Sequence, residues 1–306
     1  MKRKKNYPLM NPKVDFAFKE IMLDEQALKG FLGSVLKINP EQIKEIIYKN
    51  PNMPKVHKED KLSILDVRIM IEVDSSSEKK HLLKEIDIEM QVSYLSTWGN
   101  RSIYYVAKML TDQRGIDKKY SNIKKAIGID VLDFTYMKET KRFHTVYHVS
   151  EDVEHLKLSD IMEWHLIELP KIPKKSDGTE LYQWVKFFSA RTPKEFAMIV
   201  QGNPYLEAAL KRLEVISQDE KKRLEYTARQ KAIFDHESYI EDSYNRGYAN
   251  GEANGIEKGR AEGRAEGIAE GEAKGRAEGI EKRNSELIAK WKAQGMTDEQ
   301  INALLN

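Results

Sequence analysis

Two acidic residues interrupt strongly apolar segments of this chain, where a carboxylate needs a partner. Asp66 lies inside SILDVRIMIEV (63–73), and Glu89 lies inside EIDIEMQVSY (85–94). Burying an unpaired carboxylate is unfavourable, so such residues usually form ion pairs or bind a cation. If the two segments are neighbouring strands, Asp66 and Glu89 can share one Mg²⁺ ion, which takes oxygen ligands together with substrate phosphate.

A metal ion held in this way would favour hydrolysis. It lowers the pKa of a bound water and stabilises charge on a phosphodiester. Gln91 lies two residues after Glu89, hence on the same strand face, where its amide could hydrogen-bond a water or a phosphate oxygen. The alternative is a structural ion pair, for example between Asp66 and Arg68 or a nearby lysine. Spacing alone leaves both interpretations open.

The segments that carry these residues predict a β-hairpin. Residues 63–73 are rich in β-forming apolar side chains, whereas residues 85–94 alternate, with the acids and Gln91 on one face and Ile86, Ile88, Met90 and Val92 on the other. The polar run SSSEKK (75–80) predicts the turn between them.

Other periodic segments predict the elements around this hairpin. Their order implies an α/β fold with a mixed sheet flanked by helices. We expect helices at 15–36 and 97–113, an edge strand at 43–50 that ends before Pro51, and strands at 124–134, 143–150 and 162–170.

The second half of the chain changes character after a linker-like turn at 171–178. Its periodicity becomes helical, and the last 61 residues are dominated by a glycine repeat. We therefore expect four parts: a basic N-terminal arm at 1–14, the sheet domain at 15–170, a helical subdomain at 171–245 and a helical tail at 246–306.

Glycine recurs at every fourth position of the tail, from Gly247 to Gly279. Four residues turn an α-helix by about 400°, so the glycines would form a nearly straight ridge that lets a partner helix approach. Each glycine also destabilises a helix by roughly 1 kcal/mol relative to alanine. The pattern is compatible with self-association and equally with a solvated spacer. Thr297 and Gln300 predict a short capped helix at the end.

Composition sets the remaining limits. The 306 residues carry a net charge of +2, so any case for nucleic-acid binding rests on local patches. The basic cluster at 2–5 could touch phosphates, although such ends are more often solvated. No apolar run is long enough to cross a membrane. The absence of cysteine excludes disulfides and thiolate chemistry, and fits a reducing compartment such as the cytoplasm.

Four further residues are candidates for binding DNA or phosphate. Asp15 and Lys19 lie four apart on the first predicted helix and could face the acids, although such pairs are often surface ion pairs. Arg101 and Tyr104 lie three apart on the helix at 97–113 and could contact a phosphate; packing is the alternative. The histidines at 144, 148, 155 and 165 show no ligand-like grouping, and His165 and Trp164 are expected to pack.

The ordered set of motifs resembles a known family. Asp66 is followed after 23 residues by the triplet Glu89-Met90-Gln91, and the phrases NPKVDFAFKEIM, ILDVRI and IDIEMQVSY flank these positions. Together with Arg101, the pair Tyr104-Tyr105 and the glycine-repeat tail, they resemble the PD-(D/E)XK nuclease superfamily. Within it they are most similar to the recombination-promoting nucleases, also described as PD-(D/E)XK nuclease family transposases. The resemblance covers about residues 8–170.

This resemblance implies a restriction-endonuclease-like fold and hydrolysis of DNA phosphodiester bonds with Mg²⁺ or Mn²⁺. It implies that Asp66, Glu89 and the backbone carbonyl of Met90 hold the metal, with Gln91 as the third catalytic residue. Gln91 stands where the wider superfamily has lysine, and it supplies a dipole instead of a positive charge. The similar group itself has glutamine there.

Three hypotheses follow for function. The chain could be a DNA endonuclease of a recombination system or mobile element. It could bind DNA through a nuclease fold without cutting it. It could also act chiefly through its tail as an assembling protein, with the sheet domain as a scaffold.

Overall fold

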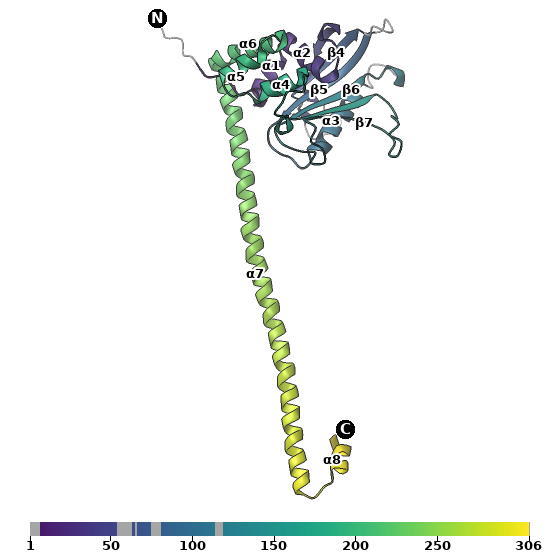
Figure 1. Ribbon diagram of the computed structural model, residues 1–306, viewed down its shortest axis with the longest axis vertical. Coiled ribbons are helices and arrows are strands. Elements are labelled where there is room, and N and C mark those ends of the chain that lie inside the picture. Colours follow the sequence, from purple (N-terminus) through teal and green to yellow (C-terminus); the bar gives the residue numbers. More distant parts are fainter. Residues whose placement is uncertain (1–6, 54–62, 65, 75–80, 114–118, 306) are drawn as a thin grey trace. The chain divides into compact units, whose positions relative to one another are not determined.

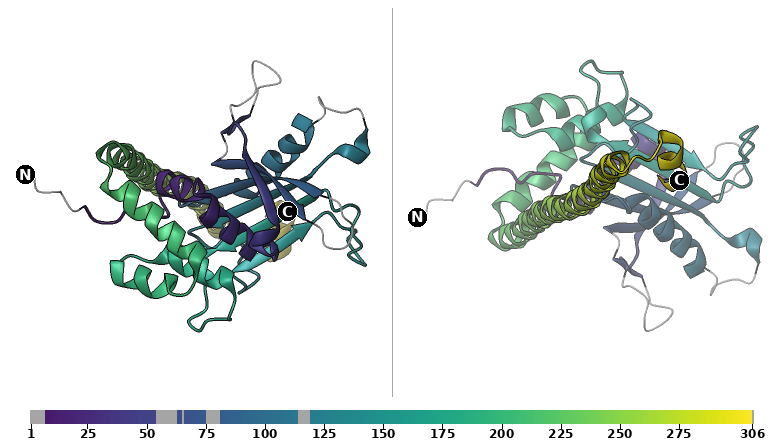
Figure 2. Two further views of the ribbon diagram at one scale, coloured as in Figure 1. Left: turned by 90° about the horizontal axis from the view of Figure 1, so that it is seen from above. Right: turned by 90° about the horizontal axis from the view of Figure 1, so that it is seen from below.

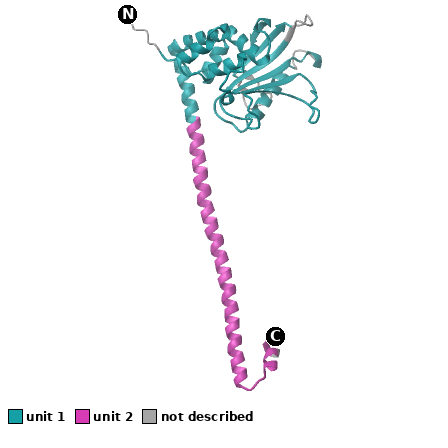
Figure 3. Cartoon of the chain, viewed as in Figure 1, with its two compact units in different colours: residues 1–235 teal, residues 236–306 magenta. Residues whose placement is uncertain are grey.

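The computed structural model describes residues 7–53, 63–64, 66–74, 81–113 and 119–305 (Figure 1). The basic cluster at 2–5 and the expected turn at 75–80 lie outside these ranges. The chain divides into two compact units, residues 1–235 and residues 236–306 (Figure 3).

A six-stranded mixed sheet organises the first unit, in the order β1-β4-β5-β6-β8-β7 (Figure 1). Strands β1, β4 and β5 pair antiparallel, β5, β6 and β8 pair parallel, and β7 is antiparallel to β8. The predicted mixed sheet, hairpin and edge strand are confirmed. The strands are β1 (Ile43–Tyr48), β4 (Val67–Asp74), β5 (His81–Gln91), β6 (Lys125–Leu132), β7 (His144–His148) and β8 (Met162–Glu168), with β2 (Asn52–Met53) and β3 (Ser63–Ile64) as a separate pair.

Helices cover both faces of this sheet (Figure 2). On one face the inward residues of the strands share a single apolar core with α1, α2, α4, α5 and α6, and on the other face lies α3. The helices of the first unit are α1 (Asp15–Met22), α2 (Glu25–Leu36), α3 (Trp98–Asp112), α4 (Glu180–Ser189), α5 (Pro193–Val200), α6 (Pro204–Gln218) and the start of α7 (Glu220–Ala293), with 3-10 turns η1 (Pro40–Gln42), η3 (Tyr120–Asn122) and η4 (Leu169–Lys171).

The alternation of β4 and β5 decides what each face contains. Ile69, Ile71, Ile86 and Ile88 are fully buried in the main core. The residues that alternate with them along the strands point to the α3 side. The apolar clusters between α3 and the sheet are small, which leaves room for polar residues there. One face of the hairpin is therefore a rigid hydrophobic base, and the other is available for chemistry.

Aromatic rings fix α2 and α4 within the main core. Phe31 packs edge-on against Trp184 and Phe188 at centroid distances of 5.5 and 5.8 Å, and Phe18 of α1 lies 5.5 Å from Phe188. The helices expected as a subdomain thus share their core with the sheet. Such ring pairs add stability beyond the area that they bury.

The first predicted helix is in fact two helices. The prediction of one continuous helix over residues 15–36 was wrong. The chain leaves the helix at Leu23, and Asp24 begins α2 as its N-cap. The Asp24 carboxylate accepts a hydrogen bond from the backbone N–H of Ala27 at 3.0 Å. The N-cap starts a new helix here, although the helical spacing of apolar residues continues across the break.

The second unit contains most of α7 and the short helix α8 (Asp298–Leu305). Gly295 has a positive φ of 87°, which ends α7. Thr297 and Gln300 exchange hydrogen bonds of 3.1 and 3.5 Å, so the predicted cap is confirmed. Within the described ranges, no helix combines the length and hydropathy needed to cross a membrane.

Gly30 provides a test of the packing between α2 and α6. A Cβ atom at this position would lie 2.2 Å from Tyr205 Cβ and 2.5 Å from Tyr205 Cγ. We expect Gly30→Ala to lower the free energy of unfolding by about 1–3 kcal/mol, since the crowded core must shift. Urea denaturation measures this. Gly255→Ala is the matched control, because no atom lies within 4 Å of its added methyl group; equal stability of both variants would contradict the packing.

Candidate active site

Asp66 and Glu89 lie side by side, although 23 residues separate them in the chain. β4 and β5 pair with Val67 opposite Ile88, so the residue before Val67 faces the residue after Ile88. The Asp66 N–H donates to Glu89 Oε1 at 3.0 Å, and the Met90 N–H donates to Asp66 Oδ2 at 3.1 Å. Each carboxylate is thus fixed by the strand that carries the other one.

Two cations reach this pair from α1 and α3. Lys19 Nζ lies 2.9 Å from Asp66 Oδ1. Arg101 Nη2 lies 3.9 Å from Glu89 Oε2, which is long for an ion pair. Asp66 is therefore well paired, and Glu89 is only weakly compensated.

Gln91 is held at both ends of its amide. Its Oε1 accepts a 2.6 Å hydrogen bond from Arg101, and its Nε2 donates to the carbonyl oxygen of Ser93 at 2.9 Å. An amide has two donor hydrogens and two acceptor lone pairs, so one of each remains for a further partner. Gln91 is thus oriented by its neighbours and keeps some hydrogen-bonding capacity.

Two more carboxylates share the buried face, and the sequence analysis did not single them out. Asp87 precedes Glu89 by two residues on β5, and Asp130 lies opposite Glu89 in the parallel register of β6. Both are buried, with 3% of their surface exposed. Ser102 Oγ donates to Asp130 Oδ2 at 2.7 Å, whereas Asp87 Oδ1 has no hydrogen-bond partner in the described part of the chain.

Burial and mutual repulsion raise the pKa values of these acids. Burial comes first, followed by the nearby carboxylates, and together they raise the pKa of Asp87 and of Glu89 well above their usual values. Burial raises the pKa of Asp130 to about 7, against the opposing influence of Ser102 and Arg101. The four acids Asp66, Asp87, Glu89 and Asp130 therefore carry more potential negative charge than Lys19 and Arg101 balance.

This set of donors fits a hard divalent cation. Its ligand atoms are carboxylate oxygens, which suit Mg²⁺ and Mn²⁺. The unpartnered Asp87 oxygen is a second sign that the site is electrostatically incomplete. The predicted role of the Met90 carbonyl as a ligand stays a prediction.

Asp15 and Tyr104 lie away from the acids. Asp15 Oδ2 is 3.8 Å from Arg229 Nε, and Asp15 Oδ1 accepts from the Phe16 N–H. Tyr104 is 46% exposed. Of the helix pair Asp15 and Lys19, only Lys19 reaches the site.

Tyr105, the neighbour of Tyr104, faces the acids instead. The Arg101 guanidinium lies 5.7 Å from the centre of the Tyr105 ring. Burial raises the pKa of Tyr105, and although Arg101 opposes this, the charges of Glu89 and Asp87 add to it. Helix spacing alone could not decide which of the two adjacent tyrosines of α3 lies on the side of the acids.

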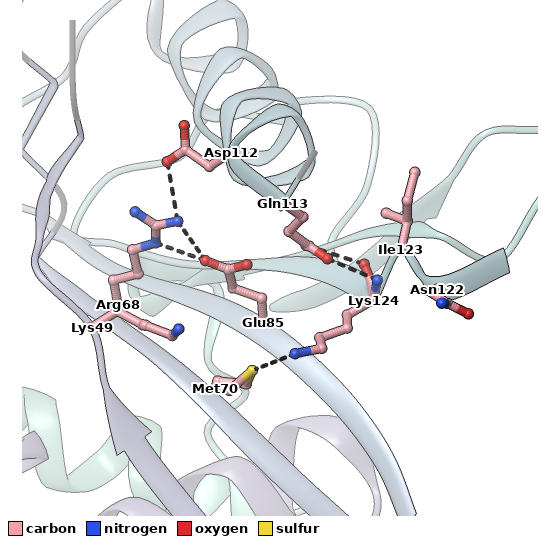
Figure 4. Close-up of a pocket in the computed structure, with 9 residues that line it drawn as sticks. All are labelled: Lys49, Arg68, Met70, Glu85, Asp112, Gln113, Asn122, Ile123 and Lys124. Atoms are coloured by element: carbon pink, nitrogen blue, oxygen red, sulfur yellow. Dashed lines mark hydrogen bonds and ion pairs between the residues drawn. The ribbon is translucent and has the colours of Figure 1, made fainter. Parts of the chain in front are cut away.

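The structural alternative was an ion pair of Asp66 with Arg68 or a nearby lysine, and the structure shows a lysine, Lys19, in place of Arg68. The Arg68 guanidinium contacts Glu85 Oε1 at 2.6 Å and Asp112 Oδ2 at 3.2 Å (Figure 4). Lys19 and Asp66 lie 47 residues apart on α1 and next to β4, so their pairing required the fold.

Histidines group at the β7–β8 edge, which the sequence analysis did not expect. His144 Nε2 lies 2.9 Å from His165 Nδ1, and His165 Nε2 lies 2.6 Å from Glu163 Oε1. One ligand atom each of His148, Asp160 and Glu163 lies within 4.8 Å of the others, a spacing compatible with a metal ion.

A lysine already neutralises this second cluster. Lys125 Nζ lies 2.7 Å from Glu163 Oε2 and 2.9 Å from Asp160 Oδ2. Burial would raise the pKa of Glu163, but hydrogen bonds from His165 and Lys125 outweigh it and hold the pKa well below its usual value. These carboxylates are therefore ionised and paired, in contrast to Glu89.

The mixed sheet flanked by helices, with adjoining acids on two central strands, is consistent with a restriction-endonuclease-like α/β fold. The model of the PD-(D/E)XK nuclease family transposases matches residues 12–243, and the chain belongs to this family. The resemblance inferred from the motifs is thereby confirmed. Comparison with curated proteins and with solved structures returns no significant match.

Asp130→Asn tests the electrostatics of the face. The folded protein holds the Asp130 proton more tightly than the unfolded chain, so wild-type stability falls as pH rises from about 4 to about 7. Removing the charge should leave stability unchanged near pH 4 and raise it above pH 7, on the order of 2–4 kcal/mol.

Urea denaturation in EDTA at pH 4 and pH 8 measures this difference. Asp152→Asn removes an exposed carboxylate and serves as the control. If the free energy of unfolding of both variants changes with pH in the same way, Asp130 is not the carboxylate whose burial destabilises the folded protein.

Proposed function

We propose that this protein is a Mg²⁺- or Mn²⁺-dependent DNA endonuclease associated with recombination or a mobile element. The observation that carries the proposal is the adjoining pair Asp66 and Glu89, placed among buried acids that Lys19 and Arg101 do not balance. Membership of a nuclease family supports the same chemistry.

Asp66 and Glu89 would hold the cation, with the Met90 carbonyl as a further ligand. When bound, such a cation lowers the pKa of a water molecule and offsets charge on the phosphodiester. Lys19 contacts Asp66 from α1 and would hold that carboxylate in place.

Gln91 would orient the attacking water. Its amide is fixed by Arg101 and has one donor and one acceptor position left. Arg101 brings a permanent positive charge next to a residue that has only a dipole, and could stabilise the negative charge that develops on the phosphate. Arg101 thus complements glutamine at the position where the wider superfamily has lysine.

DNA is the proposed partner, and the cytoplasm the proposed location, compatible with a chain that lacks cysteine. Basic residues beside the acids would contact the phosphate backbone. Such contacts depend on salt and carry little sequence information.

A plasmid-nicking assay with Mg²⁺ or Mn²⁺ tests the site. We expect Asp66→Asn and Glu89→Gln to lower the nicking rate at least about 100-fold, because each replaces a charged ligand by a neutral amide of the same shape; loss of residues that only support ligands already costs about 10- to 100-fold. Asp160→Asn is the control from the second acidic cluster and should nick like wild type.

The control makes the outcome decisive. Equal nicking by wild type, Asp66→Asn and Glu89→Gln would rule out the proposed site. Loss of nicking in Asp160→Asn alone would place the metal at the β7–β8 edge instead.

The second candidate is a nuclease fold that binds DNA without cutting it and assembles through its tail. Gln91 in place of lysine favours it, as do tail glycines whose added Cβ atoms would meet nothing within 4 Å. DNA binding without metal-dependent nicking in the wild-type protein would support this alternative.

The glycine ridge makes assembly testable by itself. If a second copy packs on it, Gly259→Ala, Gly263→Ala and Gly267→Ala together should weaken the oligomer, since the methyl groups block close approach. Sedimentation velocity measures the mass, with a chain ending at residue 242 as the monomeric reference. Each alanine should stabilise an isolated helix by about 1 kcal/mol relative to glycine. Higher helicity by circular dichroism with unchanged mass would therefore indicate that the tail is a spacer that does not self-associate.

A further inference from the structure

A pocket of about 220 Å³ opens on the same sheet face as the acids. It lies where β1, β4 and β5 meet the end of α3 (Figure 4). Its charged lining residues are Lys49, Arg68, Glu85, Asp112 and Lys124. At roughly 30 Å³ per water molecule, the volume accommodates a small anionic group with some solvent.

Two lysines are aimed into this pocket from different elements. Lys49 follows β1, and its backbone N–H donates to the carbonyl oxygen of Arg68 at 2.8 Å. Lys124 precedes β6, and Gln113 bonds both its N–H and its carbonyl, at 2.8 and 3.3 Å. Figure 4 shows the two ammonium groups pointing toward each other across Met70. The backbone around each lysine is thus anchored.

The pocket carries positive charge without a matching acid. Arg68 is occupied by Glu85 and Asp112. Lys124 Nζ donates to the sulfur of Met70 at 3.3 Å, and in the described part of the chain neither Lys49 nor Lys124 forms an ion pair. Three cations against two carboxylates leave one net positive charge. That charge matches a single phosphodiester.

We infer that this pocket binds a backbone phosphate of the DNA substrate between Lys49 and Lys124. The inference rests on the proposed function, in that DNA is the substrate of the neighbouring acids. Met70 lies four residues beyond Asp66 along the chain, which is about 13 Å at roughly 3.3 Å per residue. The pocket phosphate therefore lies a few nucleotides from the cleaved bond and positions the duplex relative to the acids.

The test is DNA binding without cleavage. A fluorescein-labelled duplex is titrated with the full chain in EDTA from 50 to 200 mM salt, and the anisotropy gives Kd. Lys49→Ala with Lys124→Ala should weaken binding on the order of tenfold and reduce the slope of log K against log salt by about 0.9, the contribution of one phosphate contact.

Two further variants separate charge from fold. Lys49→Arg with Lys124→Arg keeps both positive charges and should restore most of the affinity. Lys194→Ala removes an exposed lysine of α5 and should leave the slope unchanged. Wild-type affinity and slope in the double alanine variant would overturn the inference, whatever the nicking assay gives.

A second arm distinguishes backbone phosphate from a free phosphate compound. Melting temperatures are recorded with 10 mM inorganic phosphate or deoxyadenosine monophosphate. If these raise the Tm of wild type but not of the double alanine variant, while both bind DNA equally, the pocket serves a free phosphate and the inference fails. Nicking by wild type is scored separately, so failure of the nuclease proposal is recognised by itself.

Discussion

The main constraint on this structure is a group of buried carboxylates with too little positive charge around them. On the α3 side of the sheet, Asp87, Glu89 and Asp130 lie beneath a helix in surroundings that disfavour their ionised forms. Arg101 pairs with Glu89 at 3.9 Å, and its charge opposes the raised pKa of Asp130. Such an arrangement weakens a folded protein at neutral pH unless a cation completes it, as the proposed metal ion would.

The apolar core on the other face of the sheet offsets the cost of these buried acids. Most of the fold could be predicted from the sequence. Clean alternation along 85–94 and the turn before it indicated the hairpin. The apolar base under that hairpin comes from its alternate residues, together with Phe31 and Trp184. The break between α1 and α2 was not predictable from the apolar period, because the Asp24 cap acts locally against a pattern that runs through it. The order β6-β8-β7 likewise depends on pairings that no local pattern specifies.

The site was predictable only in part. Antiparallel pairing in a hairpin brings Asp66 to Glu89, so this contact followed from the sequence. Asp130 was missed, although it too is an acid inside an apolar strand, since its place opposite Glu89 depends on a parallel register across the α3 connection. Lys19 reaches Asp66, and Tyr105 packs against Arg101, through the orientation of their helices. The histidine group at the β7–β8 edge required the pairing of those strands, and Lys125 within it shows that clustered ligands can be satisfied by an ammonium group.

The proposed metal site on the hairpin can be located without reference to activity, by anomalous diffraction from crystals grown with Mn²⁺. We expect a peak bonded to carboxylate oxygens of both Asp66 and Glu89. A map with no peak there, or with Mn²⁺ only beside His148 and Glu163, would contradict this proposal.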